Sequence, residues 1–506
     1  MKLLLQMPID AAARRNVRLR DAIEARQARE EAVIELLALW IVLGIICTVL
    51  LLVWWAPTSA HAQTVEMSIP IAEASKRTGI NTDYLIDDDA TRTVDQSMST
   101  ALKTLGAHYL RFPEGEEGDD YLWSIPPFTA PNPRFARTGP NEWPSNDAKY
   151  ALPDMTPRNL LDFDEFIALT RSVGGEPVVI VCYDSMYKAA TAFGTIPTRQ
   201  QLLDTAVAWV RYANVVRGYH VTYWELGNES YQMSSNGGTD AVQYAKDLIT
   251  FGAAMKAVDP TIKLGANGSE KGTWWQTVLT NAAPSIDWLS YHNYPIWAWG
   301  SYDHYRLNNP VLDTGIHSTL SALDRYAPAH KTRIQVAVTE WAPIDFSTSG
   351  AWANTNDLGH AIVAFDMLGA LLEEPRVLFS NFWVTHWPIL GGWNALTMQN
   401  DLTPVGRAFS LWGQALGTTV SMPTVTEPVK IWMTTGPMGL TMFLRNKGMS
   451  YQPVTLSGLP AGTIQHKVFT GSGPSDVAPT YLVMPDIIGG AVTLPPVSVT
   501  VLTVQP

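Results

Sequence analysis

Cysteine and basic charge are both scarce in this chain of 506 residues. The two cysteines are Cys47, in an apolar N-terminal segment, and Cys182, in the β-like run EPVVIVCYD, so we expect no disulfide and an inert core thiol at Cys182. Lys and Arg number 35 against 47 Asp and Glu, which gives a net charge of −12. Such a chain lacks the basic face that nucleic-acid binding requires, and we predict no nucleic-acid partner.

Signatures of metals and cofactors are missing as well. The ten histidines show no metal-ligand spacing, and no Gly-x-Gly-x-x-Gly follows a strand-like run. We therefore predict no metal and no other cofactor. Hydrophobic residues make up 46% of the chain and charged residues 16%, a balance that allows a large core and argues against disorder.

The N-terminal segment carries a targeting pattern. Residues 36–55 contain no charge and are long enough to span a hydrocarbon core of about 30 Å. Basic residues lie within 1–35, and the next one is Lys76, which predicts a cytoplasmic N-terminus and a periplasmic or extracellular main body. Because Ala60-His61-Ala62 resembles a cleavage site, a secreted protein and one anchored in the inner membrane by residues 36–55 are both open.

Eight strand-like runs alternate with helical patterns from residue 78 onward. Each run is apolar throughout, which indicates a parallel sheet buried on both faces, and eight repeats predict a (β/α)8 TIM barrel over 78–417. A doubly wound open sheet is the alternative. The expected strands are 79–86, 107–113, 176–183, 219–226, 261–266, 286–292, 333–340 and 376–384, and the helical patterns include 159–175, 201–216, 241–259 and 359–375.

The pattern changes after residue 417. Short alternating runs with Gly and Pro turns predict an antiparallel β-sandwich over 418–506. Residues 63–77 precede the barrel, and we expect the strand at 64–72 to join the sandwich. Residues 114–158 form a long insertion after the second barrel strand, where such a loop usually belongs to a binding site.

Two glutamates close apolar strands of the expected barrel. Glu229 follows the fourth strand, in YWELGNESY, and Glu340 ends the seventh, in AVTEW. Catalytic residues of such barrels lie at the carboxyl ends of strands. Two carboxylates facing each other across a groove are what glycosidic bond cleavage needs, one protonated and one ionised. The alternative is that each glutamate is a surface or ion-paired residue.

The order of motifs resembles clan A retaining glycoside hydrolases, most closely glycoside hydrolase family 51, which holds α-L-arabinofuranosidases and some endoglucanases. The resemblance runs from about residue 79 to the C-terminus. It is carried by YLRFPEGEEGDDYLW (109–123), YWELGNESY (223–231), LSYHNYP (289–295), VTEWAP (338–343) and LTPVGRAFSLWGQALG (402–417).

The resemblance implies the roles of the central residues. Glu229 would be the acid/base and Glu340 the nucleophile of a double displacement. Asn228 would hold the sugar 2-hydroxyl, a contact that tightens in the transition state.

Further residues are expected to support this pair. Arg111 and Tyr294 would hydrogen-bond the nucleophile and keep it ionised, and His292 would line the same floor. Glu225, on the fourth strand itself, is expected to point inward in a structural role. The predicted substrate-binding set is completed by Trp341, Trp383 and Asn81.

The chain departs from the family where Glu114-Gly115 replaces the usual Gly-Gly, which puts a carboxylate near the mouth. Tryptophans in the loops of the catalytic face suggest stacking platforms for several sugar units, at Trp123, Trp143, Trp297, Trp299, Trp387 and Trp393. We therefore expect an exported endo-β-glucanase or exopolysaccharide hydrolase acting on a polysaccharide or oligosaccharide. An exo-acting α-L-arabinofuranosidase and a non-catalytic, membrane-tethered carbohydrate-binding protein are the alternatives.

Overall fold

The structure is a computed structural model, and its described residues all belong to one compact unit, residues 62–506. The predicted membrane or signal segment, 36–55, lies outside the described residues. Among those that are described, no helix is both long and apolar enough to cross a bilayer. The described ranges are 63–66, 72–73, 77–119, 121–123, 136–137, 161–187, 197–232, 239–295, 300–343, 352, 355–387, 391–415, 417, 419–437, 439–459, 464–485, 487 and 490–504.

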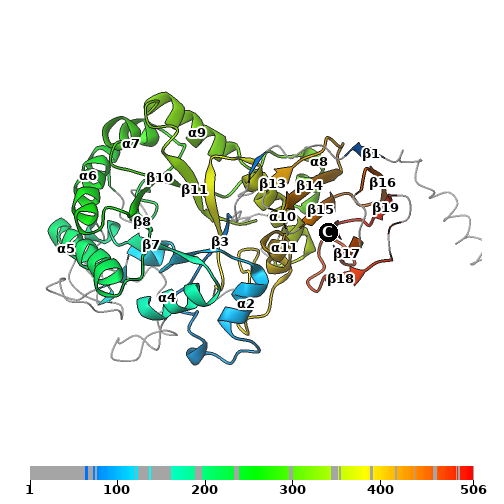
Figure 1. Cartoon of the computed structure of the whole chain (residues 1–506), viewed down its shortest axis with the longest axis horizontal. Coiled ribbons are helices and arrows are strands. Elements are labelled where there is room, and N and C mark those ends of the chain that lie inside the picture. The colour runs from blue at the N-terminus through cyan, green and yellow to red at the C-terminus, as the bar shows by residue number, and fades with distance from the viewer. Residues whose placement is uncertain are drawn as a thin grey trace, which may run out of the picture. The chain divides into compact units, whose positions relative to one another are not determined.

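Eight parallel strands close into a barrel in chain order, which confirms the predicted architecture and excludes the open sheet (Figure 1). Each expected strand is present but shorter or shifted by a few residues. The strands are β3 (Thr78–Asn81), β4 (Tyr109–Phe112), β7 (Glu176–Val181), β8 (Tyr223–Leu226), β9 (Lys263–Gly268), β10 (Trp288–Asn293), β11 (Gln335–Trp341) and β12 (Val377–Phe382).

Helices surround the barrel, and their limits follow local capping chemistry. The helix expected from 159 begins at Phe163 because Asp162 and Glu165 form a capping box. The helix expected over 241–259 ends at Val258, two residues before Pro260. The helices are α2 (Met98–Leu105), α4 (Phe163–Ser172), α5 (Arg199–Val210), η4 (Arg211–Val216), α6 (Ala241–Val258), α7 (Trp274–Ala282), α8 (Tyr302–Asn308), α9 (Thr314–Tyr326), α10 (Leu358–Glu373) and α11 (Pro404–Gly413).

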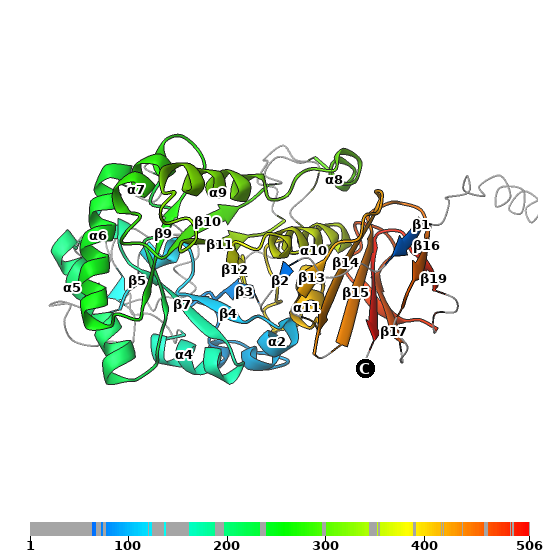
Figure 2. The same ribbon diagram turned by 45° about the horizontal axis from the view of Figure 1, so that its top comes forward.

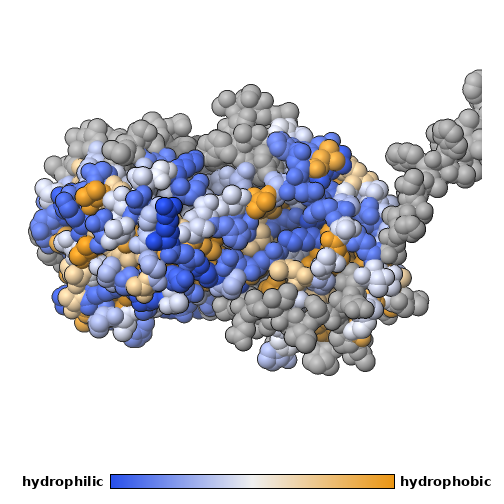
Figure 3. All heavy atoms as spheres, turned by 90° about the horizontal axis from the view of Figure 1, so that it is seen from above, coloured by the Kyte–Doolittle hydropathy of each residue, from blue (hydrophilic) through white to orange (hydrophobic). Residues whose placement is uncertain are grey.

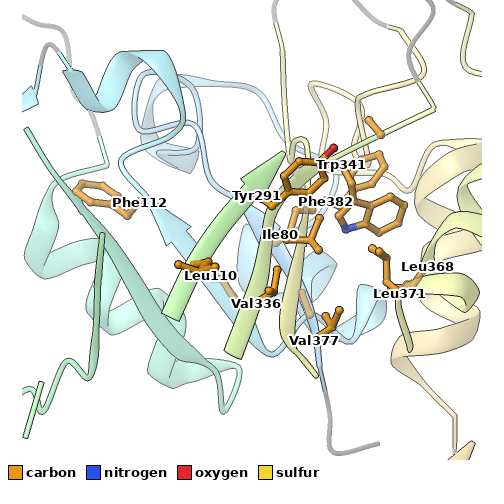
Figure 4. Packing of buried hydrophobic residues seen from close by; sticks show 14 of the residues in the cluster. Ile80, Leu110, Phe112, Tyr291, Val336, Trp341, Leu368, Leu371, Val377 and Phe382 are labelled. Atoms are coloured by element: carbon orange, nitrogen blue, oxygen red, sulfur yellow. The ribbon is translucent and has the colours of Figure 1, made fainter. Parts of the chain in front are cut away.

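Alternation along the strands separates the inside of the barrel from the outside. Outward residues pack under the helices; Figure 4 shows Ile80 and Val336 in this apolar layer, together with Leu368 of α10. Inward residues at the start of the strands form an aromatic plug, in which the rings of Tyr109 and Phe379 stack with centroids 4.5 Å apart. The next inward residues are Arg111 on β4 and Glu225 on β8, and they therefore lie one layer closer to the carboxyl ends of the strands.

Two further sheets build the sandwich. One has seven strands in the order β18 (Thr480–Val483), β17 (Ile464–Thr470), β20 (Ser498–Val504), β15 (Gly439–Asn446), β14 (Val429–Gly436), β13 (Thr419–Ser421) and β2 (Ala72–Glu73). The other joins β1 (Gln63–Glu66), β16 (Gln452–Ser457) and β19 (Ala491–Leu494). The single strand expected at 64–72 is thus two short strands, one in each sheet, and β1 pairs parallel to β16.

Helices α10 and α11 connect the barrel to the seven-stranded sheet (Figure 2). The Trp412 ring of α11 meets Trp432 of β14 edge-on at 5.7 Å. Phe365 of α10 makes a similar contact with Trp432 at 5.5 Å. This apolar contact is supported by a buried ion pair between Asp366 of α10 and Arg445 of β15.

Candidate active site

A tight turn after β8 presents the first glutamate. Gly227 and Glu229 both have left-handed backbone angles, with φ of 72° and 48°. Gly227 also needs its missing side chain, since a Cβ there would lie 2.5 Å from Asp184 Oδ2. The turn directs Asn228 toward the barrel axis and leaves Glu229 at the edge of a cavity.

The two predicted catalytic glutamates come together. Glu340 is the penultimate residue of β11, and one of its carboxylate oxygens, one of Glu229 and one His292 nitrogen all lie within 4.8 Å of one another. His292 of β10 bridges the pair, with Nδ1 2.8 Å from Glu229 Oε1 and 3.2 Å from Glu340 Oε2. A separation this short matches the spacing of about 5–5.5 Å in retaining glycosidases and leaves no room for the water of an inverting mechanism.

Arg111, buried on β4, is the hub of the polar layer above the aromatic plug. Its NH1 group donates to Glu340 Oε1 at 3.1 Å and to Asn81 Oδ1 at 2.9 Å. Its NH2 group donates to Asn228 Oδ1 at 2.7 Å, and its Nε donates to Glu225 Oε2 at 2.8 Å. The predicted bond from Arg111 to the second glutamate is therefore present, and it belongs to a network that spans four strands.

Other donors complete the coordination of the two carboxylates. Tyr294 donates from its hydroxyl to Glu340 Oε2 at 2.8 Å, as predicted. Sequence reasoning missed Tyr231, which donates to Glu229 Oε1 at 2.9 Å, and Gln232, whose amide donates to Glu229 Oε2. Both residues follow directly in the motif GNESYQ, so their position in the turn was the available signal.

The electrostatics of the pair differ from the simple prediction. Burial raises the pKa of Glu340, and the charges of His292 and Arg111 offset this only in part, so the pKa stays above its ordinary value. Arg111 and Tyr294 lower the pKa of Glu340, as predicted, but burial and the neighbouring carboxylate of Glu229 raise it by more than the lowering causes together.

Glu229 and His292 affect each other's pKa through their hydrogen bond. Burial raises the pKa of Glu229, but the hydrogen bond and charge of His292, the hydrogen bond from Tyr231 and the charge of Arg111 together outweigh it, so the net pKa lies below its ordinary value. Burial lowers the pKa of His292, and the charges of Glu340 and Glu229 reverse this and raise it. His292 thus favours the ionised form of Glu229, and Glu229 favours the protonated form of His292.

Two predicted substrate-binding residues are buried supports. Asn81 has no exposed surface, and its amide donates to the carbonyls of Thr339 and Phe382 while its oxygen accepts from Arg111. Trp341 is fully buried and packs edge-on against Phe382 at 5.0 Å (Figure 4). Their prediction as sugar contacts is wrong, because their side chains point into the protein and not to the mouth.

The predicted tryptophan platforms divide into three groups. Trp123 is fully buried and stacks on Trp209 at 6.2 Å, so it belongs to the core. Trp143, Trp297 and Trp299 lie outside the described residues. Trp383, Trp387 and Trp393 are half-buried, and the rings of Trp383 and Trp387 are 5.8 Å apart.

The loop after β4 comes close to the second glutamate. A Cβ on Gly115 would lie 2.5 Å from Glu340 Oε1 and 2.6 Å from the Trp383 ring, so glycine is required at this position. Trp383 and Glu340 thus lie close to the same point of the loop, and the role of Trp383 in substrate binding stays a prediction. Glu114, expected as a carboxylate near the mouth, is instead buried.

A cavity opens beside Glu229. Its volume is about 750 Å³, and Glu229, His292 and Tyr294 line it together with Trp274 and Lys271. Glu340 is not among its lining residues. Figure 3 shows one face of the molecule, on which hydrophilic residues prevail and hydrophobic ones are scattered.

Glu229, His292 and Glu340 form a group of side chains that could in principle hold a metal ion. Two carboxylates and an imidazole are ligands that a divalent cation accepts. Here, however, His292 Nδ1 lies between the two carboxylates at hydrogen-bond distance, and Arg111 already supplies a cation to Glu340. The absence of a catalytic metal stays a prediction.

Comparison with known proteins agrees with the fold. No family model matches the chain. Over 226 residues it is 28% identical to α-L-arabinofuranosidase C of Emericella nidulans, a match that covers 38% of this chain and 39% of that protein. The matches span less than half the length of the curated relatives.

Solved structures match over a larger part of the chain. The α-L-arabinofuranosidase of Thermotoga maritima, solved with arabinose, is 21% identical with a TM-score of 0.67, and the match covers 88% of this chain and all of that one. A family 44 xyloglucanase of Paenibacillus polymyxa is 15% identical with a TM-score of 0.58, over 88% and 100% of the two chains. These findings confirm the predicted resemblance to family 51.

Proposed function

We propose that this chain, which resembles the family 51 arabinofuranosidases in sequence and fold, is a retaining glycoside hydrolase. The observation that carries the proposal is the pair Glu229–Glu340, with carboxylate oxygens within 4.8 Å at the carboxyl ends of two barrel strands. Each carboxylate is held by donors whose own positions are fixed by neighbouring strands. Such pre-organisation is what a charged transition state requires.

The geometry supports a double displacement. Glu340 attacks the anomeric carbon, and Glu229, which is hydrogen-bonded to His292, gives a proton to the departing oxygen. The glycosyl ester on Glu340 is then attacked by a water molecule whose proton returns to Glu229, which releases a sugar of retained configuration. Asn228 accepts from Arg111 through Oδ1, an orientation that leaves its Nδ2 as the donor for the 2-hydroxyl.

An α-L-arabinofuranoside is the substrate that the comparisons support best. Curated relatives and similar solved structures carry arabinofuranosidase activity in their names. The comparisons therefore favour the alternative of the sequence analysis over the endo-β-glucanase.

An endo-acting polysaccharide hydrolase is the second candidate. The cavity of about 750 Å³ lies on the acid side of the pair, where the leaving group departs, and its volume suits a saccharide. Trp274 and Tyr231 supply aromatic surface in its lining. The structural likeness to a xyloglucanase is in line with this reading.

One experiment separates the two candidates. The full-length chain is incubated with arabinan, arabinoxylan, xyloglucan and β-glucan, and products are sized, with Glu340→Ala as the inactive control. Free arabinose alone supports the arabinofuranosidase, and oligosaccharides from a glucan support the endo-acting enzyme. No product from any substrate, with the fold intact, would count against both and favour the non-catalytic binding protein.

We also propose that the chain is exported, because residues 36–55 are an uncharged run of membrane-spanning length. Cell fractionation and the intact mass of the recovered protein test this. A mass that begins at Gln63 would support signal cleavage, and a full-length chain in the membrane fraction would support an anchor. Full-length protein in the cytoplasm would contradict the proposal.

A further inference from the structure

Glu225 is a buried carboxylate that the double displacement does not use. It is fully buried, as is its partner Arg111. Trp224 faces outward and meets Trp209 of α5, so the alternation of β8 turns Glu225 toward the barrel axis. Burying a charge in such a place costs free energy unless the charge is paired and hydrogen-bonded.

The contacts of Glu225 are one-sided. Its Oε2 accepts from Arg111 Nε at 2.8 Å, while its Oε1 has no hydrogen-bond partner among the described residues. Tyr244 of α6 is near enough for Glu225 to raise its pKa. Its hydroxyl, however, donates to the carbonyl of Leu226 and not to Glu225. Within the described part of the chain, Arg111 is therefore the cation that pairs with this charge.

Arg111 binds two carboxylates on different edges of its guanidinium. Nε faces Glu225, and NH1 faces Glu340 at 3.1 Å. With the Nε edge fixed, the planar group has one remaining orientation, which aims its outer nitrogens at Glu340 and Asn228. Without the Glu225 charge, the whole positive field of Arg111 would act on Glu340.

We propose that Glu225 is a positioning residue that orients Arg111 and sets the charge felt by the Glu229–Glu340 pair. The expected effect on catalysis rests on the proposed function. The expected effect on the titration of the pair does not depend on it. Glu225 adds one negative charge to the cluster, which makes ionisation of the pair harder and keeps a proton available in it. The charged and titratable groups that face this cluster are Arg111, His292, Tyr294, Tyr231 and Tyr244.

The test compares Glu225→Gln, Glu225→Asp and wild type by carbon-13 NMR of glutamate labelled at the side-chain carboxyl. Glu229→Gln and Glu340→Gln assign the two signals. In Glu225→Gln, which keeps the shape but not the charge, we expect the titration of the pair to move about one unit toward lower pH. In Glu225→Asp, which keeps the charge but retracts it by one methylene, we expect the titration to stay in place.

Kinetics give a second readout. For Glu225→Gln we expect kcat to fall about ten- to a hundredfold, with both limbs of the pH profile moved to lower pH. KM should change less than about twofold, since Glu225 does not line the cavity. Glu225→Asp should lower kcat without moving the limbs. Glu427→Gln, which removes a carboxylate from a buried arginine in the sandwich, should change neither kcat nor the titration.

Two results would overturn the proposal. One is a titration of the pair that is the same in Glu225→Gln and wild type. The other, decisive if Glu225→Gln does not fold, is wild-type kcat in Glu225→Asp. A pair that shifts as expected in a chain that hydrolyses no glycoside would uphold the proposal and refute the proposed function. Hydrolysis with an unshifted pair would do the reverse.

Discussion

Arg111 in the barrel and Arg445 in the sandwich are alike in their immediate chemistry. Their side chains are 0% and 1% exposed, and each lies between two carboxylates. Arg445 pairs with Asp366 at 3.0 Å and with Glu427 at 2.9 Å, and it also donates to the carbonyl of Pro428.

The two clusters differ in what they leave unpaired. Among the described residues, Glu225 Oε1 and His292 Nε2 of the Arg111 cluster are buried without a hydrogen-bond partner. In the Arg445 cluster, Tyr305 donates to the second oxygen of Asp366, and Glu427 is 37% exposed to water. A buried arginine with satisfied partners joins two parts of a scaffold. A buried arginine whose neighbours keep polar atoms without hydrogen-bond partners at strand ends is instead typical of a functional site.

The largest difference between the clusters is expected on removal of their carboxylates. Glu340→Ala should lower kcat at least about ten-thousandfold, because no other group can form the glycosyl ester. Glu427→Ala should leave kcat unchanged and reduce thermal stability. Rates on the best substrate and melting curves for both variants test this, and substantial turnover by Glu340→Ala would refute its role as nucleophile.

A smaller and more selective loss is expected at Glu229. Glu229→Ala should slow hydrolysis about a hundred- to ten-thousandfold for natural leaving groups, which need a proton, and much less for nitrophenolates. Rates across a series of leaving groups measure this. Equal slowing over the whole series would show that Glu229 is not the acid.

The two arginines can be compared directly. Arg445→Met leaves Asp366 buried without its cation and should cost about 3–5 kcal/mol of unfolding free energy, with kcat of the folded fraction unchanged. Arg111→Met should destabilise to a similar degree and also lower kcat about a hundred- to a thousandfold, since Glu340 and Asn228 lose their donor. Denaturant titration and kinetics separate the outcomes, and full activity in Arg111→Met would remove the contrast between the clusters.

His292 in the Arg111 cluster and Glu427 in the Arg445 cluster should make contributions to stability that change with pH in opposite directions. His292 has a raised pKa in the fold, so its contribution is complete below its ordinary value of 6.5 and is lost as pH rises through the folded value. Burial raises the pKa of Glu427, but Arg445 and Lys447 together lower it by more, so its contribution is present above 4.5 and is lost as pH falls.

Melting temperatures between pH 4 and 9, a range spanning both of the ordinary values of about 4.5 and 6.5, measure these contributions. His292→Asn should differ from wild type most in acid, and Glu427→Gln most at neutral pH. If the difference in melting temperature between His292→Asn and wild type grew toward alkaline pH, the raised pKa of His292 would be contradicted.

The smallest effect is expected at the rim. Trp383→Ala removes the ring beside Gly115 and should raise KM several-fold with little change in kcat, because a stacking contact is worth about 1 kcal/mol. Trp209→Ala, in the core stack with Trp123, should instead destabilise the fold. Unchanged KM in Trp383→Ala would remove Trp383 from the substrate-binding set.

The barrel and the central pair could be predicted because the necessary signals are local. Eight apolar runs that alternate with helical patterns predict the strands, and a glutamate at the end of an apolar strand is predicted to lie at the mouth of the barrel. Helix limits were less accurate, since capping residues such as Asp162 set where a helix begins.

Side-chain direction could not be predicted so well. Trp341 neighbours Glu340 in sequence, but the alternation of β11 turns it to the opposite side, into the core. Asn81 resembles a sugar contact by type, yet its three hydrogen bonds are all internal. The pKa order of the pair depends on His292, which lies 2.8 Å from Glu229 but 63 positions away in sequence.

The most direct test of the account is to trap the covalent intermediate. The chain would be incubated with a 2,4-dinitrophenyl 2-deoxy-2-fluoro-α-L-arabinofuranoside, digested and sequenced by mass spectrometry. The account predicts one fluoroarabinosyl group per chain, attached as an ester to Glu340, and no label in Glu340→Gln. A label on Glu229 or on any other residue would contradict the assignment of the nucleophile.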